Sequence, residues 1–265
     1  MRTRRQMSIN NSLSHGICNY NCRLCGVNKP NYRGPKEFQP ESVTRRLIQA
    51  VKDSSSEGVR IAYIANAGDG EPTLHPDFPS RMDLFGDMIR TWAAPTPPPE
   101  GSVVTNAARL SEPAILDTFT RNPLTLIVSF PTCDPAAYGD IMACDSARGE
   151  ALLQRAVQGI EKAMRLCAAG AIRKIQFHSS PPLREIVRRD FPRTVEFLAA
   201  RAAAAGLGAL DLIMFPSTTN RSGLILNRIR RMDMYGDLFR RFDNKPVHGV
   251  TIRMRLLQRR FFPRF

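Results

Sequence analysis

The chain has 265 residues, 43% of them apolar, and carries a formal net charge of +14 at pH 7, which suits one large domain with a substantial core. No run of about 18 apolar residues occurs and no apolar segment follows the basic residues 1–5, so we expect neither a membrane span nor a secretory signal. Six cysteines do not make a disulfide framework in a chain of this size, and we predict a cytoplasmic protein.

The positive charge would suit an anionic partner such as nucleic acid, because a cationic surface attracts phosphates. However, the arginines are spread in pairs along the chain with no dense tract, and few aromatic residues lie among them to stack on bases. We therefore favour a solvated, arginine-rich surface, with a nucleic-acid partner as the alternative.

The first predicted element is a strand over residues 7–13, and a loop with Cys18, Cys22 and Cys25 in C-x3-C-x2-C spacing follows it. Three thiolates can hold a metal or an iron–sulfur cluster. Four thiolates complete an ordinary [4Fe–4S] cluster, so three would leave one iron open to a non-protein ligand. The alternative is a structural zinc with His15 as its fourth ligand.

Beyond this loop, strand patterns and helix patterns alternate strictly. Together with the first strand they make six β–α units, which predicts an α/β fold with a parallel sheet. Residues 133–148, between the fourth strand and its helix, are predicted as a loop. The remaining predicted strands are residues 59–65, 102–106, 124–130, 172–178 and 209–216, and the predicted helices are residues 41–52, 76–92, 111–120 (capped by Ser111), 149–169 and 191–205.

The turn Gly70-Glu71-Pro72 follows the second strand. In this order, the cysteine triplet and the turn resemble the signature of the radical S-adenosylmethionine (radical SAM) superfamily. There the open iron is chelated by the amino and carboxylate groups of the cofactor, and a G-E-P element contacts the methionine amino group. The resemblance implies that the three cysteines bind one [4Fe–4S] cluster and that Gly70, Glu71 and Pro72 bind S-adenosylmethionine. A zinc site would explain neither the turn nor the strand–helix alternation.

Two further residues are candidates for cofactor binding. Thr105-Asn106-Ala107 ends the third strand and resembles the T-N-G of the family. Ser129 lies in the fourth strand, which is similar to a family strand whose serine contacts the cofactor ribose. The alternative for Asn106 and Ser129 is an ordinary cap at a strand end.

Six units resemble the open (β/α)6 partial TIM barrel of radical SAM enzymes, in which chemistry lies at the carboxyl ends of the strands. We predict that residues 1–246 form this domain and that residues 247–265 extend it with an edge strand and an apolar flap. The stretch Thr219 to Gly223 resembles an N-R-G-G element of SPASM/twitch-type members. Those members carry an auxiliary-cluster domain, but no cysteine follows Cys167 in this sequence, so we predict a single cluster.

The resemblance implies that a donor such as flavodoxin or ferredoxin reduces the cluster, which then cleaves S-adenosylmethionine to a 5′-deoxyadenosyl radical that takes hydrogen from a substrate. We expect a small-molecule or peptide substrate in natural-product biosynthesis. The alternatives are an RNA-modifying radical SAM enzyme and a non-enzymatic, zinc-binding, basic interaction protein.

The candidate substrate-binding residues lie at or after the ends of the later predicted strands. Gln176 and His178 end the fifth strand, and Asn220 and Arg221 follow the sixth, so all four are candidates for the barrel mouth. Cys133 follows the fourth strand and is a candidate to return a hydrogen atom to a substrate radical, as in some family epimerases. The alternative for Cys133, an unreactive loop thiol, is the one we favour.

Overall fold

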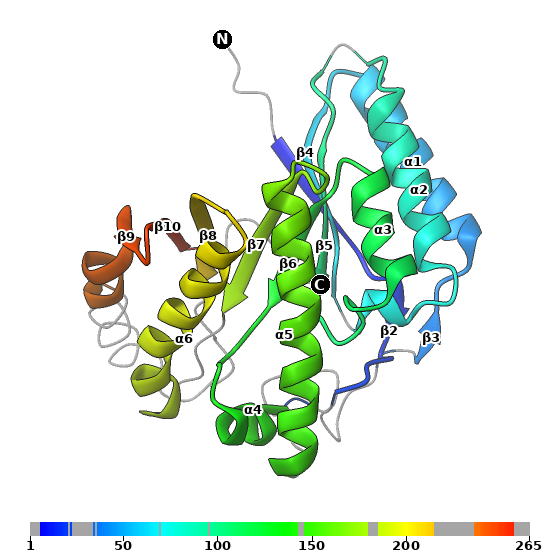
Figure 1. Ribbon diagram of the computed structural model, residues 1–265. Helices are drawn as coiled ribbons and strands as arrows, with labels where there is room; N and C mark the ends of the chain where they lie inside the picture. The colour runs from blue at the N-terminus through cyan, green and yellow to red at the C-terminus, as the bar shows by residue number, and fades with distance from the viewer. Residues whose placement is uncertain are drawn as a thin grey trace, which may run out of the picture.

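Figure 1 shows the computed structural model, which describes residues 6–20, 22, 34, 36–68, 70–94, 96–142, 146–179, 185–214 and 236–256. One sheet of eight strands, in the order β1-β4-β5-β6-β7-β8-β10-β9, runs through this part of the chain. Every pairing from β1 to β10 is parallel, and the β9–β10 pairing is antiparallel. The predicted α/β fold with an open parallel sheet is therefore confirmed. The strands are β1 (Gln6–Asn11), β4 (Arg60–Asn66), β5 (Glu100–Thr105), β6 (Thr125–Ser129), β7 (Lys174–Ser179), β8 (Ala209–Met214), β9 (Lys245–Val247) and β10 (Val250–Leu256).

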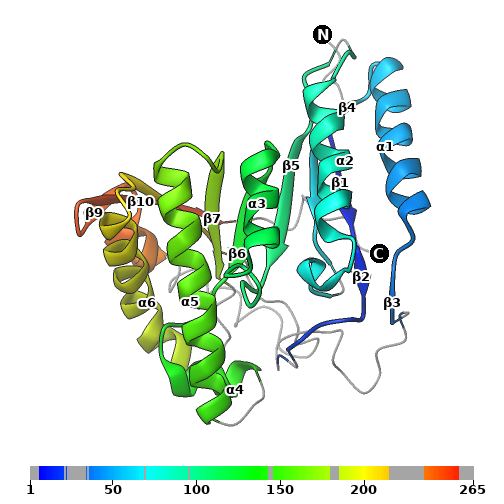
Figure 2. The ribbon, with the colours of Figure 1, turned by 45° about the vertical axis from the view of Figure 1, so that its right-hand side comes forward.

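The long helices lie along one face of this sheet, as both ribbon views show (Figures 1 and 2). They are the crossover connections that parallel strands require. None of the described helices is both long enough and apolar enough to cross a bilayer. The helices are α1 (Glu41–Ser56), α2 (Phe78–Arg90), α3 (Pro113–Arg121), α4 (Pro135–Met142), α5 (Ser146–Ala168) and α6 (Glu185–Ala204), with a 3-10 turn η1 (Pro72–Leu74).

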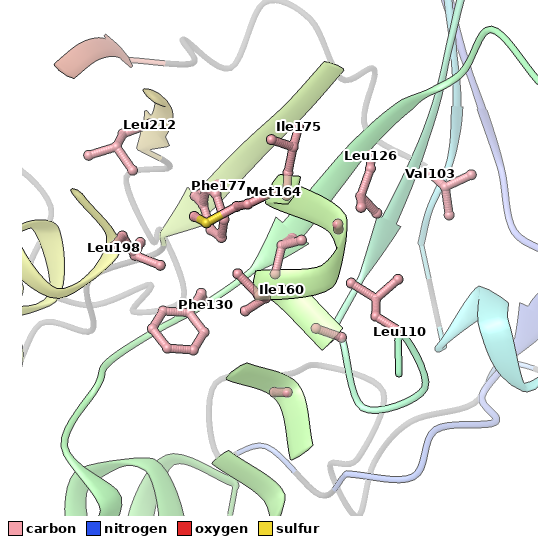
Figure 3. Packing of buried hydrophobic residues seen from close by; sticks show 14 of the residues in the cluster. Val103, Leu110, Leu126, Phe130, Ile160, Met164, Ile175, Phe177, Leu198 and Leu212 are labelled. Atoms are coloured by element: carbon pink, nitrogen blue, oxygen red, sulfur yellow. The ribbon is translucent and has the colours of Figure 1, made fainter. Parts of the chain in front are cut away.

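The core lies between the sheet and these helices. In Figure 3, Ile160 and Met164 of α5 lie beside Phe177 of β7, and all three are almost fully buried. Because side chains alternate along a strand, Gln176 and His178 point to the opposite face from Phe177. We call that opposite face, away from the helices, the inner face.

The end of the sheet differs from the prediction. Residues 247–265 were expected to supply an edge strand, but β10 pairs with β8 on one side and with β9 on the other, so β9 is the edge and β10 adds a seventh parallel strand. His248 and Gly249 join β9 to β10 with positive φ values of 49° and 76°. Two left-handed residues in a row make the tight hairpin turn that matches strand twist. Residues 257–265, the expected flap, lie outside the described residues.

Residues 135–142 form helix α4, where a loop was predicted. The Oδ1 of Asp134 accepts a hydrogen bond from the N–H of Ala137 at 2.8 Å, and Pro135 is the first helical residue. This is an N-cap followed by proline, a start signal that the sequence contains. Helix α4 packs against α5 where a Cβ on Gly149 would lie 2.6 Å from the Cα of Gly139, so position 149 does not tolerate a side chain.

The helix starts also differ from the prediction. Helix α3 begins after Glu112, with no side-chain cap, so Ser111 is not its cap. Helix α6 begins at Glu185, before the expected Phe191, and contains Pro192 in its first half. It ends at Ala204, and the predicted stop residue Gly206 follows with a φ of +83°, which suits the left-handed position after a helix.

Candidate active site at the carboxyl ends of the strands

A cavity of about 290 Å³ lies on the inner face, at the carboxyl ends of the central strands. Its wall combines the cysteine loop, the turn after β4, the ends of β5, β6 and β7, and the last turn of α4. The structure thus brings together predicted site residues that are far apart in the sequence. Those lining the cavity are Cys18, Cys22, Gly70, Glu71, Asn106, Ser129 and His178.

The turn after β4 packs directly on the backbone of the cysteine loop. A Cβ on Gly70 would lie 1.7 Å from the carbonyl oxygen of Ser14 and 2.5 Å from that of Ile17, so only glycine fits. The next N–H, that of Glu71, donates to the carbonyl of Ile17 at 2.9 Å. Because Ile17 precedes Cys18, this contact fixes the first cysteine relative to the turn.

The carboxylate of Glu71 is held inside the protein. Its Oε1 accepts from the N–H and hydroxyl of Thr73, at 3.2 and 2.6 Å, and from the hydroxyl of Thr105 at 2.6 Å. Its Oε2 accepts from the N–H of Asn106 at 2.8 Å. Burial raises the pKa of Glu71, while the hydrogen bonds act in the opposite direction. The Glu71 side chain therefore caps η1 and links the turn to β5.

Asn106 connects the end of β5 to the cysteine loop. Its Nδ2 donates to Oδ1 of Asn19 at 2.8 Å and lies 3.9 Å from Sγ of Cys18, and its Oδ1 accepts from the N–H of Ala108 at 3.0 Å. Ala107, the third residue of the T-N-G-like stretch, has a φ of 65°. That left-handed conformation explains why glycine suits this position.

The described cysteines of the loop are Cys18 and Cys22, and Cys25 lies outside the described residues. The Sγ of Cys18 accepts a hydrogen bond from the N–H of Tyr20 at 3.4 Å. The Sγ of Cys22 lies 3.2 Å from Sδ of Met142, the last residue of α4. Both thiols are half-buried and line the cavity.

Helix α4 supplies site residues that sequence reasoning missed. The hydroxyl of Tyr138 donates to that of Tyr20 at 3.3 Å, and burial raises the pKa of Tyr20 to about 12. The two rings meet edge to face with centroids 6.4 Å apart. Ile141 and Met142 add apolar cavity wall. Recognising the Asp134-Pro135 helix start would have placed these residues near the strand ends.

Gln39 joins the two ends of the cysteine loop. Its N–H donates to the carbonyl of Leu13 at 3.0 Å, and its Nε2 lies 2.5 Å from Nε2 of His15. Its carbonyl accepts from Nε2 of His75 at 3.0 Å and from the Arg81 guanidinium at 2.9 Å. We call these contacts the Gln39 clasp. The sequence indicated His15 only as a possible zinc ligand and predicted none of these contacts.

The strands that precede the clasp were also unpredicted. β2 (Ser14–His15) pairs antiparallel with β3 (Glu37–Phe38), which closes the base of the loop. Among the described residues, no three Cys, His, Asp or Glu side chains converge to hold a metal ion, so His15 does not join Cys18 and Cys22 in such a group.

His178 and Gln176 lie at different depths on the inner face. His178 lines the cavity, in register with Ser129, and burial lowers its pKa to about 3, so its imidazole is neutral at pH 7. Gln176 lies two residues before His178 on β7 and is buried outside the cavity wall. Its Nε2 donates to Oδ2 of Asp211 at 3.2 Å.

The other predicted site residues are elsewhere. Cys133 packs against the core outside the cavity wall, and its N–H donates to the hydroxyl of Thr194 on α6 at 3.1 Å, which lends no support to hydrogen donation by its thiol. Pro72 is buried in η1. Asn220 and Arg221 lie outside the described residues.

Several solved structures have a fold similar to that of this chain. SuiB of Streptococcus suis, solved bound to S-adenosylmethionine, superposes with a TM-score of 0.59 at 14% identity, over 97% of this chain and 51% of SuiB. A variant of spore photoproduct lyase gives 0.57 at 13% identity, over 89% of this chain and 73% of that one. The enzyme anSMEcpe with bound AdoMet gives 0.55 at 13% identity, over 93% and 64%. These neighbours are radical SAM enzymes.

The chain has the fold of the radical SAM enzymes. At these identities the likeness is one of fold, and the chain spans about half the length of SuiB. No family model and no curated protein sequence matches the chain. In this radical SAM fold, the predicted cluster loop and the predicted cofactor turn form adjoining walls of one cavity.

Proposed function

We propose that the chain is a radical SAM enzyme that binds one [4Fe–4S] cluster through Cys18, Cys22 and Cys25 and S-adenosylmethionine in the adjoining cavity. The observation that carries the proposal is the backbone contact of Gly70 with the cysteine loop, which makes that loop and the turn after β4 walls of the same cavity. The cavity lies at the carboxyl ends of parallel strands, where folds of this kind place chemistry.

The donor set fits an iron–sulfur cluster. Thiolates are the ligands of such clusters, and hydrogen bonds to sulfur, such as that from the N–H of Tyr20 to Cys18, tune them. A structural zinc would need a fourth ligand, and Nε2 of His15, the sequence candidate, contacts Gln39, which leaves only its Nδ1 for such a role. A cluster bound there and reduced by a donor such as flavodoxin or ferredoxin would supply the one electron that breaks the S–C5′ bond of S-adenosylmethionine. The products would be methionine and a 5′-deoxyadenosyl radical, which would take hydrogen from the substrate.

The chain's own residues bind and orient the cofactor. Because the Glu71 carboxylate is committed to Thr73 and Thr105, the turn offers main-chain groups at fixed positions to the methionine amino group. Asn106 offers its side-chain amide to the cofactor, and Ser129 offers its hydroxyl to the ribose. Apolar wall residues exclude water from the reacting atoms. These wall residues are Val104, Phe130, Pro131, Ile141 and Met142.

We expect a small-molecule or peptide substrate, and a peptide has the better support. SuiB has been solved bound to its precursor peptide SuiA, with a TM-score of 0.59 at 13% identity over 94% of this chain and 48% of SuiB. A precursor peptide as substrate agrees with a role in natural-product biosynthesis.

The test is anaerobic reconstitution with iron and sulfide, followed by dithionite and S-adenosylmethionine and an assay for 5′-deoxyadenosine. We expect about four iron atoms per chain and formation of the nucleoside. Cys22→Ala should lose both. Cys167→Ala is the matched control, because Cys167 lies near the end of α5 and packs against the core.

Two outcomes would contradict the proposal. The protein could take up zinc in preference to iron, which would favour the zinc-binding alternative. It could also assemble a cluster without cleaving S-adenosylmethionine, which would remove the assignment of the cavity to that cofactor.

A further inference from the structure

Strand β10 carries two arginines on the inner face of the sheet. Val250, Ile252 and Met254 are at most 5% exposed and belong to the core on the α6 side of β10. Because side chains alternate along a strand, Arg253 and Arg255 point to the opposite face. Both are exposed, and the Arg253 side chain retains half of its accessible surface.

The register of the sheet brings Arg255 level with the cavity. Arg255 pairs with Ile213 of β8, Ile213 pairs with His178 of β7, and His178 pairs with Ser129 of β6. His178 and Ser129 line the cavity. Arg255 therefore lies two strand spacings, about 10 Å, from a cavity-wall residue. A flexible guanidinium side chain can reach across most of that distance.

Arg253 lies two residues before Arg255 on β10, and the carboxylate of Asp211 partly neutralises its charge. Its Nε is 2.7 Å from Oδ1 of Asp211, whose Oδ2 is 3.1 Å from Nζ of Lys174. Burial would raise the pKa of Asp211, but the hydrogen bond from Gln176 and the ammonium of Lys174 outweigh it, so this pKa is lowered and Asp211 is ionised.

The inner face beside the cavity is therefore cationic. Lys174, Arg253 and Arg255 carry three positive charges against two carboxylates, a balance of +1. The carboxylates are Asp211 and, at the edge of β10, Asp243, whose Oδ1 accepts from the N–H of Met254 at 2.8 Å. Among the described residues, Arg255 makes no ion pair. A guanidinium binds a carboxylate through two parallel hydrogen bonds, which makes it a specific ligand for that group.

We propose that Arg255, supported by Arg253, binds a carboxylate of the substrate, so that the substrate of this site is an acidic peptide. The inference rests on the proposed radical SAM function and names its substrate class. The alternative anion is RNA, which single-strand binders hold by stacking bases on aromatic side chains. The inner-face positions of β7, β8 and β10 hold no Phe, Tyr or Trp, and His178 is the one ring among Lys174, Gln176, His178, Asp211, Ile213, Thr251, Arg253 and Arg255. A single imidazole makes a poor platform for successive bases.

The test uses the reconstituted protein and fluorescence anisotropy at low and high salt. The probes are a labelled peptide of alternating Glu and Ala, the same peptide with Gln for Glu, and single-stranded oligouridylate. We expect the Glu peptide to bind about tenfold more tightly than the Gln peptide, and Arg255→Glu to weaken its binding about tenfold.

Arg165→Glu is the matched control. Arg165 is exposed on α5, on the helix side of the sheet, and its reversal changes the net charge by the same amount. We expect it to change the Kd for the Glu peptide by less than about twofold. Equal losses for both variants would show a diffuse charge effect and overturn the proposal. Tighter binding of oligouridylate than of the Glu peptide, also lost in Arg255→Glu, would assign the face to RNA and overturn it as well.

Failure of this inference is separable from failure of the proposed function. Formation of 5′-deoxyadenosine by the unsubstituted protein is measured in the same preparation. If the nucleoside forms but the Glu and Gln peptides bind equally, the acidic-substrate proposal alone is wrong. If no nucleoside forms, the radical SAM proposal is wrong whatever the peptides do.

Discussion

The side-chain amide of Asn106 donates to Oδ1 of Asn19 at 2.8 Å and thereby ties the end of β5 to the cysteine loop. The N–H of the same residue donates to Glu71, which belongs to the turn after β4. One residue thus links the three segments that build the candidate cofactor site. If this loop carries the proposed cluster ligands, it needs such support, because groups that orient ligands tune and retain a bound metal.

Asn106→Ala should loosen the cysteine loop. It removes the hydrogen bonds of the side chain with Asn19 and Ala108. At about 1 kcal/mol each, the free energy of unfolding should fall by about 2 kcal/mol. The reconstituted variant should lose iron to a chelator faster than the unsubstituted protein, measured by bleaching of the cluster absorbance. Gln154→Ala, on the exposed side of α5, is the control, and an unchanged rate in Asn106→Ala would contradict the role given to the amide.

Gly70→Ala should disrupt the site more severely. The new Cβ would lie 1.7 Å from the carbonyl oxygen of Ser14, so the turn and the loop would have to separate. We expect a loss of about 3 kcal/mol or more of unfolding free energy and poor iron uptake. Gly208→Ala is the matched control, because a Cβ there meets nothing within 4 Å. Thermal unfolding and iron content measure these two effects. Equal stability and equal iron content in Gly70→Ala and Gly208→Ala would contradict the prediction.

Arg81→Met should open the Gln39 clasp. The guanidinium of Arg81 is 2% exposed and donates to the carbonyl of Gln39 and to the hydroxyl of Thr44, at 2.9 and 3.0 Å. Losing a partner of buried acceptors costs about 1–3 kcal/mol. We expect lower stability in urea together with faster iron loss, and no change in either for the exposed control Arg46→Met. Lower stability with unchanged iron loss would mean that the clasp does not hold the cysteine loop.

His178 should make stability depend on pH. Its pKa of about 3 in the folded chain lies below the ordinary histidine value of 6.5, because burial disfavours the charged imidazole. The unfolded chain therefore binds the proton first as pH falls, and stability present above pH 6.5 is lost toward pH 3. Between about pH 7.5 and 5.5 the difference amounts to about 1.4 kcal/mol.

The measurement is urea unfolding of the metal-free protein at both pH values. His178→Asn should show a weaker loss of stability on acidification than the unsubstituted protein, by about that amount. His248→Asn, in the exposed hairpin turn, is the matched control. Parallel pH profiles for the unsubstituted protein and His178→Asn would show that His178 is not held neutral by burial.

Much of the fold was predictable because its signals are local. Apolar periodicity within segments predicted β4 to β8 and the helices that cover them, and Gly206 marked the end of α6. The position of β10 was not predictable in this way, since its pattern does not reveal which strands flank it. Helix α4 was not predicted, although the sequence contains its start signal: Asp134 is the N-cap and Pro135 is the first helical residue.

By itself, the sequence determined the kinds of groups available for chemistry: three clustered thiols, a Gly-Glu-Pro turn after a strand and polar residues at strand ends. Spacing along the chain carries that information because each motif lies within a few residues. Only the tertiary structure decided which of these groups meet. It brought His178 to the cavity, left Cys133 outside it, and added Tyr138 and Met142 from α4 and the Gln39 clasp. Those contacts join residues more than twenty positions apart, and packing of the whole sheet and its helices sets them.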